Sequence, residues 1–109
     1  MTIKTLSSEI SLAIEEYEAL SEASPYDQEL NQKIQELYDQ LQKAEGKEWE
    51  ESIAEYKEAK EALILASNVA QEAVNDLSKT AGAVSKAAKA LDKLVTALAL
   101  VLLIGIKPN

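Results

Sequence analysis

Four glutamates have a spacing that could place their carboxylates on one face of a helix. Glu48, Glu51, Glu55 and Glu58 are separated by three, four and three residues, so they would lie on consecutive helical turns. Carboxylates stacked in this way can ligate metal ions, but helical sites of the di-iron kind are completed by histidine, and the chain contains no His. Lysines lie within one turn of several of these acids. We therefore interpret the four glutamates as a solvated, partly paired face and expect no metal site.

The chain also lacks the side chains on which most enzyme mechanisms depend. Without Cys it has neither a thiolate nucleophile nor a disulfide, and without His it has no imidazole base. Catalysis by a pair of carboxyl groups would need one glutamate buried deeply enough to raise its pKa. Nearly every glutamate lies away from the apolar seams of the sequence. We expect no catalytic residue, no cofactor-binding residue and no enzymatic activity.

The charge of the chain bears on its partners. All 11 basic residues are lysine, against 19 acids, and the formal charge is -8. This balance argues against binding to a phosphate backbone, so no nucleic-acid partner is expected. Residues 1–61 contain 16 acids and 6 lysines, a net charge of -10, whereas residues 62–109 contain 3 acids and 5 lysines, a net charge of +2. The acidic first part leaves open one lesser alternative, an inhibitor that mimics nucleic acid.

The elements that must position any site are predicted to be helices. Good helix formers dominate, only 3 Gly and 2 Pro interrupt the chain, and apolar residues recur every three or four positions. This spacing predicts helices over 3–23, 25–44, 47–77 and 80–105. Ser24 is expected to cap the second helix with Pro25 in its first position, and Gly46 is expected to end that helix.

The boundary between the last two helices is the least clear. The apolar register continues in phase from Trp49 to Leu102, so a single helix over 47–104 is the alternative to two helices. We favour a turn, because a single helix of that length would leave much apolar surface uncovered. The residues that favour turns and caps gather in one place near the middle of this stretch: Asn75, Asp76, Ser78, Thr80 and Gly82.

These elements predict an all-α fold in one domain over 1–109. We expect an antiparallel bundle of three to four helices with a long, coiled-coil-like C-terminal half, most simply an up-down four-helix bundle. If the third helix packs against the second from a turn at Gly46, the far end of the second helix lies level with Leu65. Residues 66–77 and 81–92 would then project from the bundle as a hairpin.

The C-terminal apolar segment, residues 94–106, carries no charge. As a helix it would reach roughly 20 Å, short of the roughly 30 Å hydrocarbon core of a membrane, so membrane association is possible but not favoured. We expect it to form a central strut of the bundle through Leu94, Val95, Leu98, Val101 and Leu102. No secretory signal opens the sequence, which favours a soluble cytoplasmic protein and leaves signal-independent secretion open.

Small side chains along the projecting hairpin predict an interface. The expected interface residues are Ala66, Val69, Ala70, Ala73, Val74, Ala81, Val84, Ala87 and Ala88. We expect Ala70→Glu or Ala87→Glu to disrupt association and spare the fold. The favoured function is a non-enzymatic interaction or adaptor protein acting through helix-helix association with itself, as a homodimer, or with another helical protein. The alternative is a membrane-active or lipid-associated protein that uses its apolar last helix.

Overall fold

Four helices and one short turn of 3-10 helix make up the structure, a computed structural model that describes residues 6–44 and 54–105, with side chains to residue 100. The elements are α1 (Leu6–Ala23), α2 (Gln28–Ala44), α3 (Ala54–Asn75), η1 (Leu77–Lys79) and α4 (Thr80–Gly105). The predicted all-α helical bundle is confirmed. The predicted Gly46 terminus, Trp49, and the expected first residues of the third helix lie outside the described residues.

The turn between α1 and α2 differs from the prediction. The amide of Ser24 donates to the carbonyl of Leu20 and so belongs to the end of α1. The N-terminal cap of α2 is Asp27, whose Oδ1 accepts the Leu30 amide at 3.1 Å. Pro25 lies in a tight turn that the Asp27 amide closes by donating to the Ser24 carbonyl at 3.3 Å. The predicted start of this helix was therefore three residues early.

The turn between α3 and α4 was predicted correctly. Asp76 interrupts the helix, and its Oδ1 accepts the hydroxyl of Ser78 at 2.7 Å and the amide of the same residue at 3.2 Å. These two hydrogen bonds, the hydroxyl first, hold the pKa of Asp76 below its usual value. The hydroxyl of Thr80 then donates to the Leu77 carbonyl at 2.8 Å, where α4 begins. The described part of 47–104 therefore forms two helices.

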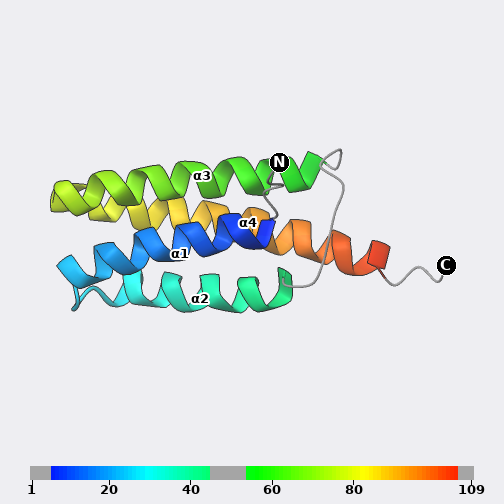
Figure 1. The fold of residues 1–109 in the computed structure, drawn as a ribbon, viewed down its shortest axis with the longest axis horizontal. Helices are drawn as coiled ribbons and strands as arrows, with labels where there is room; N and C mark the ends of the chain where they lie inside the picture. The colour runs from blue at the N-terminus through cyan, green and yellow to red at the C-terminus, as the bar shows by residue number, and fades with distance from the viewer. Residues whose placement is uncertain (1–5, 45–53, 106–109) are drawn as a thin grey trace.

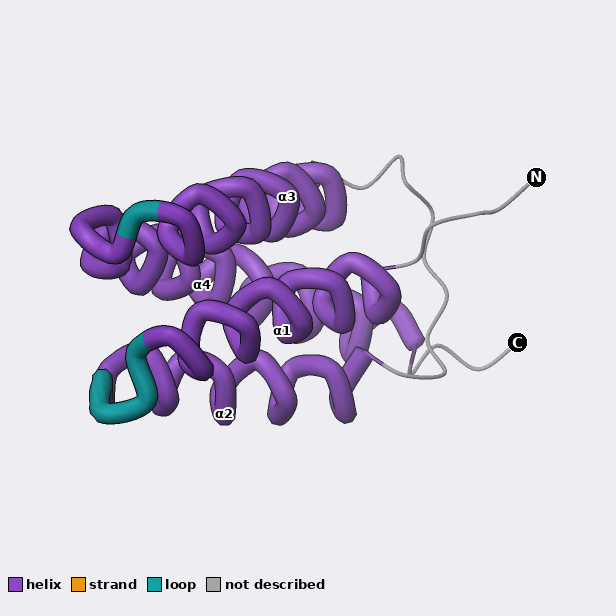
Figure 2. The backbone as a smooth tube through the Cα atoms, turned by 60° about the vertical axis from the view of Figure 1, so that its left-hand side comes forward, coloured by secondary structure: helices purple, strands orange, loops and turns teal. Residues whose placement is uncertain are grey.

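The helices form two antiparallel hairpins, α1–α2 and α3–α4, that pack against each other. Figure 1 shows that α1 and α3 run in one direction while α2 and α4 run in the other. The extensive contacts between hairpins join α1 to α3 and α2 to α4. The bundle is therefore up-down in direction, but α2 and α3, which are consecutive in the chain, lie across its diagonal. In Figure 2 both tight turns lie at the same end.

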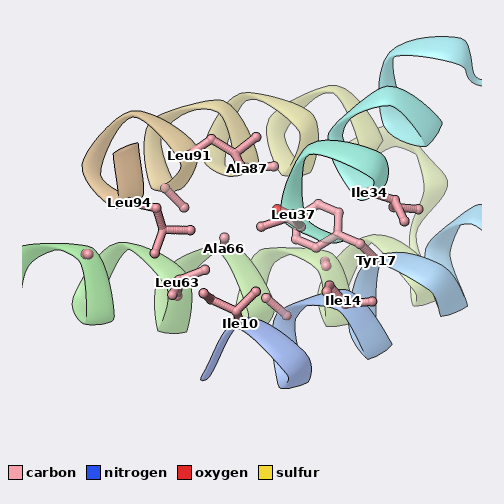
Figure 3. Packing of buried hydrophobic residues seen from close by; sticks show 14 of the residues in the cluster. Ile10, Ile14, Tyr17, Ile34, Leu37, Leu63, Ala66, Ala87, Leu91 and Leu94 are labelled. Atoms are coloured by element: carbon pink, nitrogen blue, oxygen red, sulfur yellow. The ribbon is translucent and has the colours of Figure 1, made fainter. Parts of the chain in front are cut away.

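The core combines large side chains from α1 and α2 with mostly small ones from α3 and α4. Ile10, Tyr17 and Leu37 are almost completely buried, and they face alanines such as Ala66 and Ala87 (Figure 3). Small residues on one hairpin allow the backbones to approach the bulky residues of the other at normal packing density. The Tyr17 side chain crosses the diagonal of the bundle from α1 to α4. Its hydroxyl donates to the Ala83 carbonyl of α4 at 2.6 Å.

The expected projecting hairpin is absent from the described part of the chain. Since α3 packs against α1 and α4 packs against α2, the predicted overhang is covered, and the turn ends of the two hairpins lie nearly level in Figure 1. The prediction failed because it paired α3 with α2. The element that extends past its neighbours is instead the C-terminal end of α4, at the opposite end of the bundle.

The C-terminal apolar segment is only partly the strut that was predicted. Leu94 and Leu98 are buried, but Val95 is 54% exposed, and the side chains of Val101 and Leu102 lie outside the described part of the chain. The buried residues of α4 repeat every seven positions, as Val84, Leu91 and Leu98 do. Val95 belongs to a different seven-residue series, in which Ala81 is exposed and Ala88 is half-buried. Val95 therefore lies on the flank of α4.

Candidate interaction surface

Most of the predicted interface residues are occupied by packing within the chain. Ala66, Ala70, Ala73, Val84 and Ala87 are buried between the helices. The remaining members of the set are less covered: Val69 and Ala88 are half-buried, and Val74 and Ala81 are exposed. The small side chains thus allow the two hairpins to approach each other closely, and only scattered members of the set reach the surface.

The residues that could have formed a metal site do not converge where the structure describes them. Glu48 and Glu51 lie outside the described residues, Glu55 is half-buried on α3, and Glu58 is exposed. No group of three or more His, Cys, Asp or Glu residues that could hold a metal ion occurs within 6–44 or 54–105.

Exposed ion pairs link α3 to η1 and to α4. Lys93 Nζ lies 3.4 Å from a carboxylate oxygen of Glu58, and Lys79 Nζ lies 3.7 Å from one of Glu72. Lys79 belongs to η1 and Lys93 to α4, so both ion pairs lie within the α3–α4 hairpin. Each ion pair is largely exposed and contributes about 0 to 1 kcal/mol. The charges of these two lysines are therefore compensated by glutamates of the same chain.

A groove between α1 and α2 is acidic. It has a volume of 450 Å³ and is lined by Glu18, Ser21, Glu22, Asn31, Ile34 and Gln35. The Ser21 hydroxyl donates to Asn31 Oδ1 at 2.6 Å, and the Tyr38 hydroxyl donates to Glu18 at 2.8 Å. The hydrogen bond to Glu18, followed by partial desolvation and the carboxylate charge, raises the pKa of Tyr38. These bonds use the polar groups of the groove to hold α1 against α2.

The second groove, between the parallel helices α1 and α3, has an apolar centre. Leu12 and Ile64 line the same 230 Å³ hollow, one from each helix, and each is 42% exposed. The rest of the lining is polar: Glu9, Glu16, Ser67, Asn68 and Gln71. Ile64 also lines an adjoining 310 Å³ hollow together with Tyr56, Lys57, Lys60 and Glu61. The two hollows therefore form one continuous surface, which we call the α1–α3 groove.

Sequence reasoning did not identify the α1–α3 groove. Leu12 and Ile64 both lie next to, but not on, the apolar seams assigned to their helices. In the sequence, each of these two residues is a large aliphatic side chain at a position where an amphipathic helix normally has a polar one. Such positions become a shared surface only when two helices are neighbours, and periodicity does not specify which helices are neighbours.

No helix within the described ranges is long and apolar enough to cross a bilayer. Comparison with known proteins adds no relationship: no family model, no curated protein and no solved structure matches the chain.

Proposed function

We propose that this protein is a non-enzymatic helical interaction module that associates with itself through helix-helix contacts. The observation that carries the proposal is the pair Leu12 and Ile64, two large aliphatic side chains that lie together at the surface in one groove. Single exposed apolar residues are ordinary, but a hollow with an apolar floor and a polar rim is the form of a docking site.

Two further features support an interaction role over a catalytic one. The two grooves described above are open surface features, and their linings offer carboxylates, amides and lysines in already paired or solvated settings. The buried phenol of Tyr17 donates to a backbone carbonyl and is part of the core. The α1–α3 groove is therefore the feature with the clearest use, because apolar surface is what an interface buries.

The mass of the protein in solution tests the proposal. We expect light scattering, coupled to size exclusion and run over a range of concentrations, to give twice the chain mass of 11.9 kDa. The dimer should persist at high salt, because apolar burial is screened far less than exposed charge pairs. A mass of one chain at every concentration would contradict self-association.

A second candidate function rests on the acidic α1–α2 groove. Its lining contains Glu18 and Glu22 and no lysine. A basic protein would be attracted to such a face, as expected for a nucleic-acid mimic. Binding of a basic protein that weakens steeply between low and high salt, and that Glu18→Gln with Glu22→Gln abolishes, would support this function.

A further inference from the structure

One polar side chain of α2 is buried with its carbonyl oxygen unpartnered. Gln40 is 8% exposed, and its Oε1 accepts no hydrogen bond. The other buried residues of α2 are apolar: Leu30, Ile34, Leu37 and Ala44. A buried acceptor that has lost its contact with water and gained no donor is destabilising. The packed position of α2 is therefore less stable than the same helix with an apolar side chain at residue 40.

The packing of α2 is also the less extensive part of the bundle. The contacts that α3 makes with α1 and with α4 are more extensive than those that α2 makes with either of its neighbours. Two side-chain hydrogen bonds join α2 to α1, from Ser21 to Asn31 and from Tyr38 to Glu18. The first is partly buried and the second is exposed, so water competes for both. These bonds add little to the attachment of α2.

The other three helices are joined to one another by contacts that contain no residue of α2. Helix α3 packs against both α1 and α4. The Tyr17 hydroxyl links α1 to α4 directly, through its 2.6 Å hydrogen bond to the Ala83 carbonyl. These contacts persist when α2 leaves its place in the bundle. Native proteins open in such cooperative parts, and the least stable part opens most often.

From the unpartnered carbonyl of Gln40 and these contacts we infer that α2 is a releasable helix, which leaves the bundle more readily than α3, and that Gln40 sets how readily it leaves. Release uncovers the apolar surface of α1 and α4 on which α2 packs. The fold thus contains a conformational device that covers and exposes this surface. The inference goes beyond the proposed self-association and does not depend on it.

Hydrogen exchange of the backbone amides in the intact protein measures this release. After correction for the intrinsic exchange rate of each residue, we expect the amides of 32–40 in α2 to exchange at least 10-fold faster than those of 60–70 in α3, an order-of-magnitude expectation of about one decade. Both ranges lie inside their helices, away from the ends. Equal protection of the two ranges would overturn the inference, because α2 would then open only with the rest of the bundle.

The role of Gln40 is tested by Gln40→Met, which keeps an unbranched side chain of similar length and removes the carbonyl. We expect the amides of 32–40 to exchange about 10-fold more slowly in this variant, since no buried acceptor is left without a donor. Gln32→Met is the matched control, because Gln32 is exposed on the same helix, and it should leave the exchange rates unchanged. Circular dichroism establishes that both variants remain helical.

The outcomes separate this inference from the proposed function. Weaker protection of α2 than of α3, together with slower exchange in Gln40→Met and not in Gln32→Met, supports the releasable helix. Exchange in Gln40→Met that is unchanged or faster than in the wild type overturns the inference, because the amide would then cost nothing or contribute to the packing. None of these results depends on the mass of the protein in solution, which tests self-association separately.

Discussion

Replacing Tyr17 by Phe tests the core contact that crosses the diagonal of the bundle. The substitution removes one oxygen and the 2.6 Å hydrogen bond to the Ala83 carbonyl, while the fully buried ring stays in place. Inside α4 that carbonyl can still accept the amide four residues on, so no acceptor is left without a partner. The expected loss in the free energy of unfolding at neutral pH is therefore about 1 kcal/mol, the net value of a neutral hydrogen bond.

The same substitution should act differently in alkali. Burial raises the pKa of Tyr17 well above its usual value, so the folded protein keeps this phenol neutral. The unfolded chain ionises it near pH 10 and binds fewer protons there than the folded chain. The contribution of Tyr17 to stability is thus fully present below about pH 10, and above it falls by about 1.4 kcal/mol per pH unit. The Tyr17→Phe variant has no phenol proton to lose at this position.

The wild-type advantage should therefore shrink from about 1 kcal/mol at pH 7 to about zero near pH 11. Urea unfolding followed by circular dichroism, at a series of pH values, measures both proteins. Tyr26→Phe is the control, because Tyr26 is 94% exposed and makes no comparable contact, so the difference from wild type should stay near zero throughout. A Tyr17→Phe difference that stays constant or grows above pH 10 would refute the reasoning.

Four further substitutions follow from the described geometry. Ala70→Glu or Ala87→Glu should destabilise the fold by several kcal/mol, because both residues are 0% exposed and the new carboxylate would be buried; thermal melts like those of the wild type would contradict the core. Asp27→Ala should cost about 1 kcal/mol in urea unfolding through loss of the cap on α2, and an unchanged midpoint would show that the cap contributes nothing. Gly82→Ala should raise the melting temperature slightly, with a gain of about 0.5 kcal/mol, since no atom outside its chain neighbours and its own helix backbone lies within 4 Å of the added methyl; a lower melting temperature would indicate a hidden clash.

The expectation for Ala70→Glu and Ala87→Glu shows what the sequence could and could not reveal. Residue size predicted close helix approach at both alanines, and both are buried between helices. It did not identify the neighbour. Pairing consecutive helices made 66–77 an overhang, whereas the actual neighbour of α3 is α1, which covers that segment. The choice among helix neighbours depends on long-range packing, and a 3.6-residue pattern carries no information about it.

Local chemistry was predicted unevenly for a related reason. In the second half of the sequence the residues that favour turns gather at one place, around Asp76. The turn was therefore placed correctly. At the first turn, Ser24 and Asp27 are both good caps three residues apart, and Pro25 fits either a helix start or a tight turn. In the structure the Leu30 amide donates to Asp27, so Asp27 is the cap of α2.

The diagonal step from α2 to α3 has a consequence for how the chain folds. Each hairpin is closed by its own short turn and can form from contacts that are local in sequence. Only the docking of one hairpin on the other requires distant residues to meet, and local contacts generally precede distant ones. The molecule is thus two small folding units held in register by Tyr17 and the alanines opposite it. Cleavage of the backbone between residues 44 and 54 would leave both units intact, so the two fragments should reassociate into the native bundle when mixed.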